Sequence, residues 1–345
     1  MNILTTLGIR HILKMKKAHS EALKDIRGYM ISSCISAFSS LGIFDDFRQM
    51  EEIEITAYAK NKNLDEKILT DVFSYLYSVK ILDSTNKGYK LSKKGKFLYD
   101  YALGPFSFVS AYAPVFNELG AILKKEKKYG IELHRNESLV AKASAETEKW
   151  IPYPIVKELI KKYHARNILD LGCGSAEFLI KLCLENHDLN TYGVDISQDA
   201  LKYAKKIIDD NNLGKRINLI RWDMFNIGNM PNIETQKIDI ITSMFVLHEF
   251  ITMDIDRTSR LLNILRQIKR RFKDSYLIVC ELCKQTPGQL RRNPTLMAEH
   301  HLFHALSNQI ILTFADWEDI FKKVPFCIVE KVRLDLAGQG YFVLN

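Results

Sequence analysis

The sequence predicts an α/β fold in two parts, a mainly helical N-terminal part followed by a parallel sheet covered on both faces. Two observations support this division. Up to about residue 105, apolar residues recur at helical spacing. From residue 151 onward, short apolar runs alternate with helical stretches, which is the pattern of a parallel sheet buried between helices.

The N-terminal part has the element order of a winged helix. Over residues 65–82 the apolar positions recur three and four residues apart, which predicts a helix. Residues 82–99 then contain two short strand-like pieces around an Asn-Lys-Gly turn. We therefore expect a winged helix within residues 1–105 and a helical connector over residues 106–150.

The part from residue 151 to residue 345 contains seven strand-like runs. Helices are predicted after the first, second and fourth runs, and Ser197 is the expected N-cap of the second helix. A glycine-containing turn joins the last two runs, which predicts an antiparallel hairpin at the sheet edge. The first five runs cover residues 167–172, 190–195, 217–222, 238–245 and 275–282.

Charge and composition are those of an ordinary globular protein. The 345 residues are 47% hydrophobic and 26% charged, and the net charge is +8. The basic residues are spread among predicted helices and loops, which favours solvated helix faces over a nucleic-acid stripe. The candidate recognition helix carries Asp65, Glu66 and Asp71, a poor face for phosphates. We therefore expect no nucleic-acid partner.

The cysteines and the apolar runs indicate a soluble, cytoplasmic protein without a membrane span. The six cysteines have no framework spacing, and no secretory signal precedes them. No apolar run approaches the ~18 residues that a membrane-spanning helix needs. Cys280 and Cys283 would face opposite sides of a strand, which argues against a structural zinc site.

A glycine-containing turn follows the first predicted strand. Gly172 and Gly174 stand where this strand turns into a helix, and glycine there lets the backbone approach a ligand at the helix N-terminus. A dinucleotide-binding loop has a third glycine where this chain has Glu177, whose carboxylate would repel a pyrophosphate. The loop therefore favours a ligand that carries a nucleoside and a positive charge.

Two acidic residues follow the next two strands. Asp195 ends the second strand, where a carboxylate can accept hydrogen bonds from both ribose hydroxyls. Asp223 follows the third strand between Trp222 and Met224, so that it can accept from the amine of an adenine held between apolar groups. Each feature is weak alone, but their order at the ends of successive strands is specific.

Residues 165–283 resemble a class I S-adenosylmethionine-dependent methyltransferase. The motif "LDLGCG" resembles the first motif of that family, "YGVDIS" its ribose-binding acid, "RWDMFN" its adenine-binding acid and "IDIITSMFVLHEF" its fourth strand. The whole chain is similar to the small-molecule O-methyltransferases that carry a winged-helix dimerisation domain. The resemblance implies a Rossmann-like seven-stranded domain, S-adenosylmethionine as the cofactor and a homodimer formed through the N-terminal domain. It also implies cofactor contacts from Asp170, Gly172, Gly174, Asp195, Ile196, Asp223, Met224 and Ser243.

The fourth predicted strand leads into "LHEF" at residues 247–250, which resembles the Leu-His-Asp-Trp sequence of those O-methyltransferases. There the histidine takes a proton from the substrate hydroxyl, and imidazole suits this role because its pKa lies near the working pH. Glu281 resembles one of the acidic residues that orient this histidine. His248 and Glu281 are therefore the predicted catalytic residues, although the second acid of the family has no counterpart here.

A histidine-rich segment, "AEHHLFHAL", corresponds to the lid over the substrate in that family. His300 and His304 are four residues apart and share a face of the predicted helix. His248, Glu249 and one histidine of this segment would form a set that binds a divalent or trivalent metal and leaves open positions. The chain is also similar to a C-methylating branch that acts on 2-oxo acids. This resemblance favours His300 but leaves His301 and His304 open, with iron or zinc as the metal.

Two reactions are therefore expected, of which metal-assisted C-methylation of a 2-oxo acid is favoured. The metal would stabilise an enolate whose carbon attacks the methyl group. Without a metal, His248 would deprotonate a phenol or enol oxygen and give an O-methyl product. Both reactions imply a small-molecule substrate, expected from secondary metabolism. The alternatives from other classes are a DNA-binding regulator and an RNA or protein methyltransferase, and "MFVLHEF" replaces the Pro-Pro-Tyr signature of the latter.

Overall fold

The computed structural model describes residues 8–231, 233, 237–251 and 258–345. It divides into two compact units, Met1–Ser110 and Ala111–Asn345. The first unit has its own hydrophobic core, and the second has two large cores, one on each face of its sheet. The two-part α/β organisation predicted from the sequence is confirmed.

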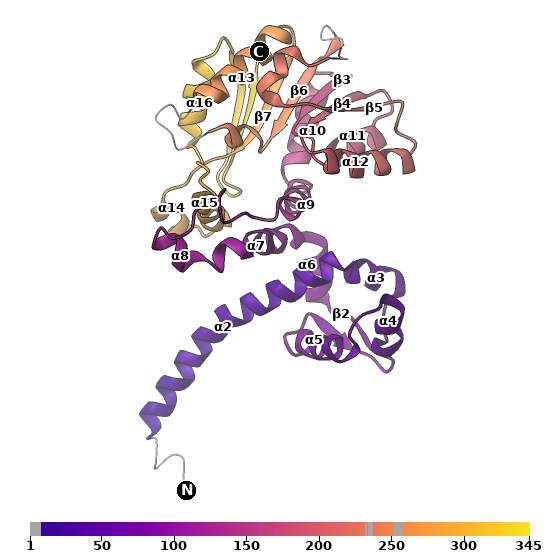
Figure 1. Cartoon of the computed structure of the whole chain (residues 1–345), viewed down its shortest axis with the longest axis vertical. Helices are drawn as coiled ribbons and strands as arrows, with labels where there is room; N and C mark the ends of the chain where they lie inside the picture. The colour runs from indigo at the N-terminus through magenta and orange to yellow at the C-terminus, as the bar shows by residue number, and fades with distance from the viewer. Residues whose placement is uncertain (1–7, 232, 234–236, 252–257) are drawn as a thin grey trace. The chain divides into compact units, whose positions relative to one another are not determined.

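The first unit consists of helices and a small hairpin (Figure 1). One face of helix α5 (Glu66–Ser78) is buried, as the spacing of its apolar residues predicted. Strand β1 (Leu82–Ser84) pairs antiparallel with β2 (Tyr89–Leu91), and a bridge between Ile53 and Tyr89 extends this small sheet. This arrangement is a winged helix. The other helices of the unit are α2 (Ile9–Ser40), α3 (Ile43–Met50), α4 (Ile55–Lys62) and α6 (Lys93–Tyr101).

The second unit contains a seven-stranded sheet with the strand order β5-β4-β3-β6-β7-β9-β8. Neighbouring strands from β5 to β7 are parallel, whereas β9 is antiparallel to both of its neighbours, which confirms the predicted C-terminal hairpin. The strand order reverses between β3 and β6, and ligands of such sheets bind at the carboxyl ends of the strands at this point. The strands are β3 (Asn167–Leu171), β4 (Asn190–Asp195), β5 (Ile217–Arg221), β6 (Ile240–Met244), β7 (Tyr276–Leu282), β8 (Ile328–Leu334) and β9 (Gln339–Leu344).

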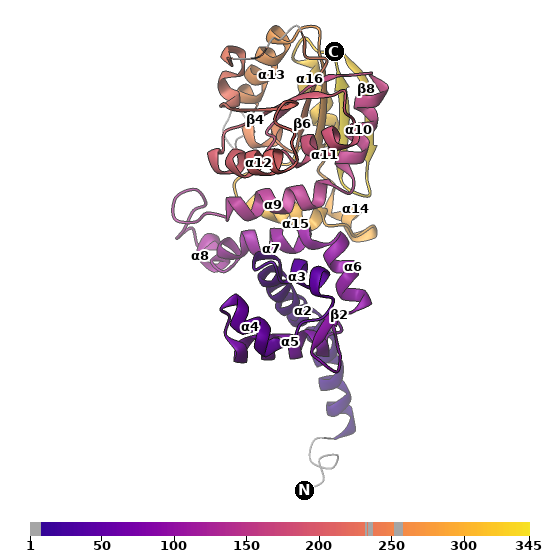
Figure 2. The ribbon, with the colours of Figure 1, turned by 90° about the vertical axis from the view of Figure 1, so that its right-hand side faces the viewer.

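Helices cover both faces of this sheet (Figures 1 and 2). Consecutive residues of one strand enter different cores: Ile168 packs among the helices α10, α11 and α12, and Leu169 among α13 and α16. Cys280 and Cys283 are likewise buried in different cores, as the alternation predicted. The bounds are α10 (Pro152–Lys162), α11 (Glu177–Glu185), α12 (Gln198–Asp210), α13 (Ser259–Arg271) and α16 (Phe314–Lys322).

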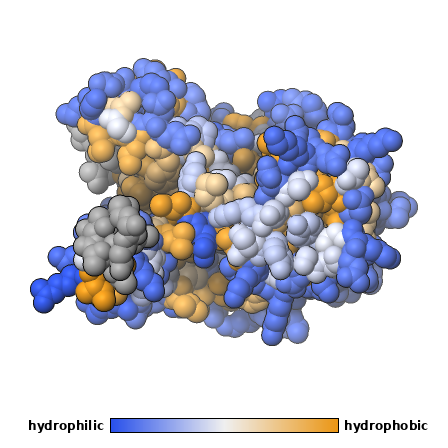
Figure 3. Space-filling model, turned by 90° about the horizontal axis from the view of Figure 1, so that it is seen from below, coloured by the Kyte–Doolittle hydropathy of each residue, from blue (hydrophilic) through white to orange (hydrophobic). Residues whose placement is uncertain are grey.

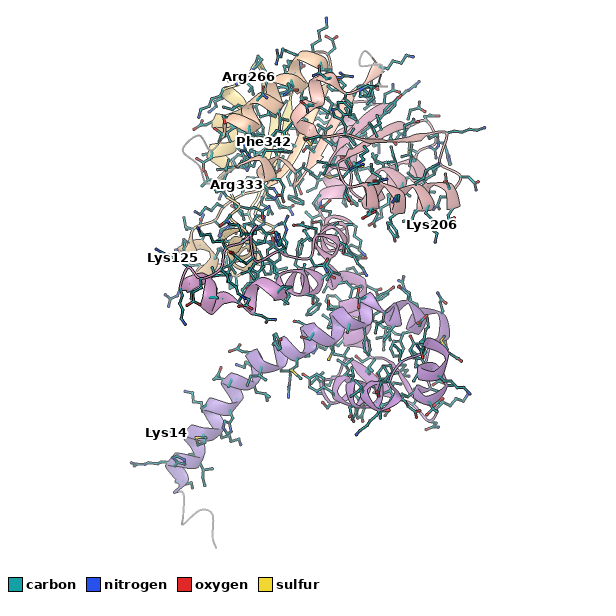
Figure 4. All side chains as sticks on the ribbon, viewed as in Figure 1. Lys14, Lys125, Lys206, Arg266, Arg333 and Phe342 are labelled. Atoms are coloured by element: carbon teal, nitrogen blue, oxygen red, sulfur yellow. The ribbon has the colours of Figure 1, made fainter. Side chains whose placement is uncertain are left out.

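Charged side chains lie on the outer surfaces of these layers. Lys206 on α12 and Arg266 on α13 extend away from the sheet, whereas Phe342 lies within it (Figure 4). None of the helices in the described residues combines the length and the apolar character needed to cross a bilayer. The remaining helices are α7 (Leu103–Phe116), α8 (Leu119–Leu123), α9 (Glu137–Glu148), α14 (Pro287–Arg292) and α15 (Met297–Leu306).

Candidate active site

The glycine turn after β3 exposes backbone groups at the carboxyl edge of the sheet. Gly172 and Gly174 have φ angles of +76° and +53°, in the left-handed region that favours glycine. A Cβ on Gly172 would lie 2.4 Å from the Val246 side chain, whereas a Cβ on Gly174 would meet no atom within 4 Å. Gly172 is therefore needed for close packing, and Gly174 presents its backbone to open space.

Asp195, at the end of β4, holds this turn in place. Its carboxylate accepts hydrogen bonds from the backbone N–H groups of Gly174 and Ser197, each at 2.8 Å. Ile196, the next residue, is 62% exposed at the same edge. The two backbone donors fix the orientation of the Asp195 side chain beside the glycine turn.

A third acidic residue lies after β5. Asp223 caps the short helix η1 (Met224–Asn229) by accepting from the N–H of Phe225 at 2.9 Å. Met224 is buried, and the ring of Phe225 packs edge-on against that of Phe250, with centroids 5.2 Å apart. A carboxylate with apolar neighbours is therefore present where the sequence predicted the adenine contact.

Asp170 and Ser243 lie on neighbouring strands below the glycine turn, and both are buried. Burial raises the pKa of Asp170 to about 7; the Thr242 hydroxyl, which donates at 2.7 Å, opposes this rise and the charge of Asp195 adds to it. The Ser243 hydroxyl has no hydrogen-bond partner among the described residues. A buried hydroxyl without a partner is free to hydrogen-bond to a ligand that reaches it.

Glu148, at the end of α9, is a further buried carboxyl group that the sequence analysis did not identify. Burial raises its pKa to about 8, and the nearby charges of Asp170, Glu177 and Glu281 raise it further. In the sequence this residue looks like part of an ordinary charged helix, so no local pattern marks it. The charges of these carboxyl groups therefore repel one another, and a bound cation would relieve this repulsion.

The structure therefore fits the predicted S-adenosylmethionine site. All eight residues predicted to contact the cofactor lie at or just beyond the carboxyl ends of β3, β4, β5 and β6. The open space beside Gly174, the unpartnered Ser243 hydroxyl and the buried acids match a ligand that has both polar atoms and positive charge.

The segment after β6 places His248 at the same edge. The strand ends at Met244, and Phe245 adopts a left-handed conformation with φ of +54°, which turns the chain into the short helix η3 (Leu247–Phe250). His248 is 5% exposed. The strand has thus ended before His248, which is the condition for His248 and Glu249 to face the same ligand.

Glu281, fully buried in β7, holds the ring of His248. One carboxylate oxygen lies 2.8 Å from Nδ1, and the other accepts from the backbone N–H groups of Leu247 at 2.6 Å and His248 at 3.3 Å. Since a carboxylate accepts, Nδ1 carries the proton and Nε2 bears the lone pair. Burial disfavours the charged imidazolium, but Glu281, and to a lesser extent Glu249, outweigh it and raise the pKa of His248.

Glu249 belongs to a network that the sequence did not reveal. Its carboxylate lies 3.7 Å from Nε2 of His248 and accepts from Arg135 at 3.3 Å and from Gln309 at 2.5 Å. The Arg135 side chain, 9% exposed, also donates to the Tyr112 hydroxyl at 2.8 Å. No motif marks Arg135 or Gln309, because the network joins four segments that are far apart in the chain.

Helix α15 carries two of the predicted histidines toward this site. The rings of His304 and His248 have centroids 5.2 Å apart, and His300 lies 6.3 Å from His304 by the same measure. Burial, reinforced by the charge of His248, lowers the pKa of His304 to about 2. Burial, together with His301 and then His248, lowers the pKa of His300 to about 4.

The structure does not bring His248, Glu249 and His300, the predicted metal set, together as a metal-binding group. Among the described residues, no group of three His, Cys, Asp or Glu side chains is arranged to hold one. The physical reason is that the Glu249 carboxylate is paired with Arg135. In addition, the described neighbour of the His248 ring on α15 is His304.

Comparisons with known proteins agree with the fold. A family model described as a methyltransferase domain matches residues 162–324. The methyltransferase ungE' of Aspergillus campestris is 20% identical over 315 residues, 86% of this chain and 88% of the relative. The structure of human N-acetylserotonin methyltransferase in complex with S-adenosylmethionine is similar to this one. The TM-score is 0.70, with 14% sequence identity over 95% of this chain and 97% of that chain. A putative O-methyltransferase from Nostoc punctiforme has a TM-score of 0.67 at 19% identity, over 94% of this chain and 98% of its own.

Proposed function

Because this chain is a class I S-adenosylmethionine-dependent methyltransferase with a winged-helix N-terminal part, we propose that it methylates a hydroxyl oxygen of a small molecule with His248 as the general base. One observation carries this proposal. The pair of Glu281 and His248 fixes the proton on Nδ1 and leaves the lone pair on Nε2. A solved structure with the same fold, that of mitomycin 7-O-methyltransferase, supports transfer to oxygen.

The cofactor would be held at the carboxyl ends of β3 to β6. In this proposal Asp195 accepts from the ribose hydroxyls, and Asp223 accepts from the adenine amine. Asp170 and Glu148 neutralise positive charge, which offsets the cost of their own burial. When bound, S-adenosylmethionine supplies a methyl group on a positively charged sulfur.

His248 then takes the proton of the acceptor hydroxyl on Nε2. The Glu281 carboxylate stabilises the imidazolium that forms, and its two bonds to backbone N–H groups keep it from rotating. Glu281 is a positioning residue in this scheme, because it acts through His248. General-base catalysis of this kind contributes about 10²–10⁴-fold to a rate.

The test compares His248→Ala with His187→Ala, a substitution of an exposed histidine. Formation of S-adenosylhomocysteine is measured with a panel of phenols and enols, and cofactor affinity is measured by calorimetry. His248→Ala is expected to lower the rate by about 10²–10⁴-fold while cofactor affinity stays within about threefold. A His248→Ala variant that turns over at the wild-type rate would contradict the proposal.

Metal-assisted C-methylation of a 2-oxo acid is the second candidate. The rings of His300 and His304 near His248 favour it, since two imidazoles and a carboxylate are a common metal-binding set. It requires Glu249 to leave Arg135. Elemental analysis of active protein purified without chelators, together with Glu249→Gln assayed on phenylpyruvate, tests it. Undiminished transfer to phenylpyruvate in Glu249→Gln would rule this candidate out.

We also propose that the chain forms a homodimer through its N-terminal part. Helix α2 is 32 residues long, yet its described buried residues are Ile35 and Phe38. Ile9, Leu13 and Ile26 on the preceding turns are exposed apolar residues that a second copy would cover. Hydrophobic surface is visible among hydrophilic residues on the face in Figure 3. Light scattering of the wild type and of Ile26→Lys tests this, and a wild-type monomer would overturn it.

A further inference from the structure

The groups around Nε2 of His248 are hydrogen-bond acceptors. Nε2 itself bears a lone pair, because Glu281 fixes the proton on Nδ1. The Glu249 carboxylate lies 3.7 Å from this Nε2. The adjacent ring on α15 belongs to His304. A molecule that binds beside this Nε2 must therefore supply the hydrogen-bond donors.

The tautomer of His304 follows from its hydrogen bond. Its Nδ1 lies 2.7 Å from the backbone carbonyl oxygen of His300. A carbonyl oxygen can only accept, so Nδ1 of His304 is the donor and Nε2 of the neutral ring bears the lone pair. No described residue donates a hydrogen bond to this Nε2, so a second free acceptor stands beside His248.

The surrounding packing holds His304 in this position. Phe303, the preceding residue of α15, stacks on Tyr112 with ring centroids 4.6 Å apart and planes at 18°. Tyr112 is in turn fixed by the hydrogen bond that its hydroxyl accepts from Arg135. The helix that carries His304 is therefore attached to the same network that positions Glu249, so both acceptors keep a constant place relative to His248.

We propose that His304 accepts a second hydrogen bond from the methyl acceptor and thereby selects molecules with two hydroxyls on adjacent carbons. The inference rests on the proposed O-methylation and names its substrate class, the vicinal dihydroxy compounds. Hydrogen bonds to oxygen span about 2.5–3.2 Å. Two rings with centroids 5.2 Å apart therefore both reach the acceptor when its hydroxyls are close together.

The two hydroxyls have different fates. The first loses its proton to Nε2 of His248, its oxygen forms the new bond to carbon, and the bond between sulfur and the methyl carbon breaks to release S-adenosylhomocysteine. The second hydroxyl donates to Nε2 of His304 and keeps its proton. His304 is thus a specificity-determining residue, whereas His248 is the base.

The test measures binding of three probes, catechol, resorcinol and phenol, to the protein saturated with S-adenosylhomocysteine. The wild type is expected to bind catechol at least tenfold more tightly than either of the others. His304→Phe keeps a buried ring but removes the acceptor, and it is expected to reduce this preference to less than threefold. His304→Gln, whose amide oxygen is an acceptor, is expected to recover part of it.

His301→Phe is the matched control, because His301 is the neighbouring histidine of the same helix and its Nε2 already accepts from the backbone N–H of Gln285 at 3.5 Å. It is expected to keep the wild-type preference. Equal affinity for the three probes in the wild type, or an unchanged preference in His304→Phe, would overturn the inference. A different result would contradict the proposed function: His248→Ala would turn over at the undiminished rate.

Discussion

The cofactor side and the acceptor side of the second unit meet at one sheet edge but are built in different ways. The cofactor side is formed by short motifs that each directly follow a strand, and backbone groups hold it, as when Gly174 and Ser197 donate to Asp195. The acceptor side is formed by side chains from distant segments, such as the set of Arg135, Glu249 and Gln309.

The cofactor side uses an arrangement that parallel sheets share, whereas the acceptor side is particular to this chain. Motifs at the carboxyl ends of parallel strands are brought together by the sheet itself, whatever the loops contain. A network of side chains from separate loops depends on each loop having its own length and packing. We therefore expect substitutions on the cofactor side to alter cofactor affinity and those on the acceptor side to alter selectivity and rate.

The largest predicted effect is on the cofactor side, in Asp195→Ala. The variant loses the carboxylate that orients the Gly174 turn and that is proposed to accept from the ribose. Since hydrogen bonds to a charged group contribute about 1.5–3 kcal/mol, cofactor affinity is expected to fall by about 10- to 100-fold. Calorimetry with S-adenosylmethionine measures this, and Asp199→Ala, an exposed position on α12, is the control. An unchanged affinity would contradict the proposed contact between Asp195 and the cofactor.

An intermediate effect is expected on the acceptor side, in Arg135→Met. The substitution leaves Glu249 and the Tyr112 hydroxyl without their donor and frees the carboxylate beside His248. We expect kcat/KM to fall by about tenfold, which corresponds to about 1.4 kcal/mol, with cofactor affinity within about threefold. Arg266→Met, on the exposed face of α13, is the control. A large loss of cofactor affinity in Arg135→Met would show that the two sides are not separable.

The third prediction concerns stability, which is expected to depend on pH. The folded pKa values of Asp170, about 7, and Glu148, about 8, lie above their ordinary values. The folded chain therefore retains protons that the unfolded chain releases, and stability falls as pH rises from about 4 to about 8. The raised pKa of His248 acts in the same direction. Each kcal/mol lost lowers the Tm by about 2–4 °C.

Thermal unfolding of the cofactor-free protein between pH 5 and pH 8.5 measures this dependence. Glu148→Gln, which replaces the acid with a neutral group of similar size, is expected to flatten the profile. Saturating S-adenosylmethionine is expected to raise the Tm most at high pH, where the carboxylates are charged. A profile that is the same in Glu148→Gln and in the wild type would contradict the role assigned to this buried acid.

Local pattern was enough to predict the strands, the helices between them and the position of the proposed cofactor residues at the strand ends. The predicted strand at 190–195 agrees with β4 at both ends, and the predicted N-cap Ser197 accepts from the N–H of Ala200. These features depend on periodicity and on residues near one another in the chain. The same reasoning did not find Glu148, because its burial comes from packing and not from its neighbours in sequence.

Contiguous residues were sufficient to predict the two-part organisation, the order of motifs along the sheet edge and His248 as the residue most suited to take a proton. The tertiary structure decided which groups stand around that histidine. It paired Glu249 with Arg135 and placed the ring of His304 beside His248, and on these contacts we propose a general base at His248. The reason is physical: a strand and its turn are set by contiguous residues, whereas the partner of a buried charge is set by which distant segments pack against it.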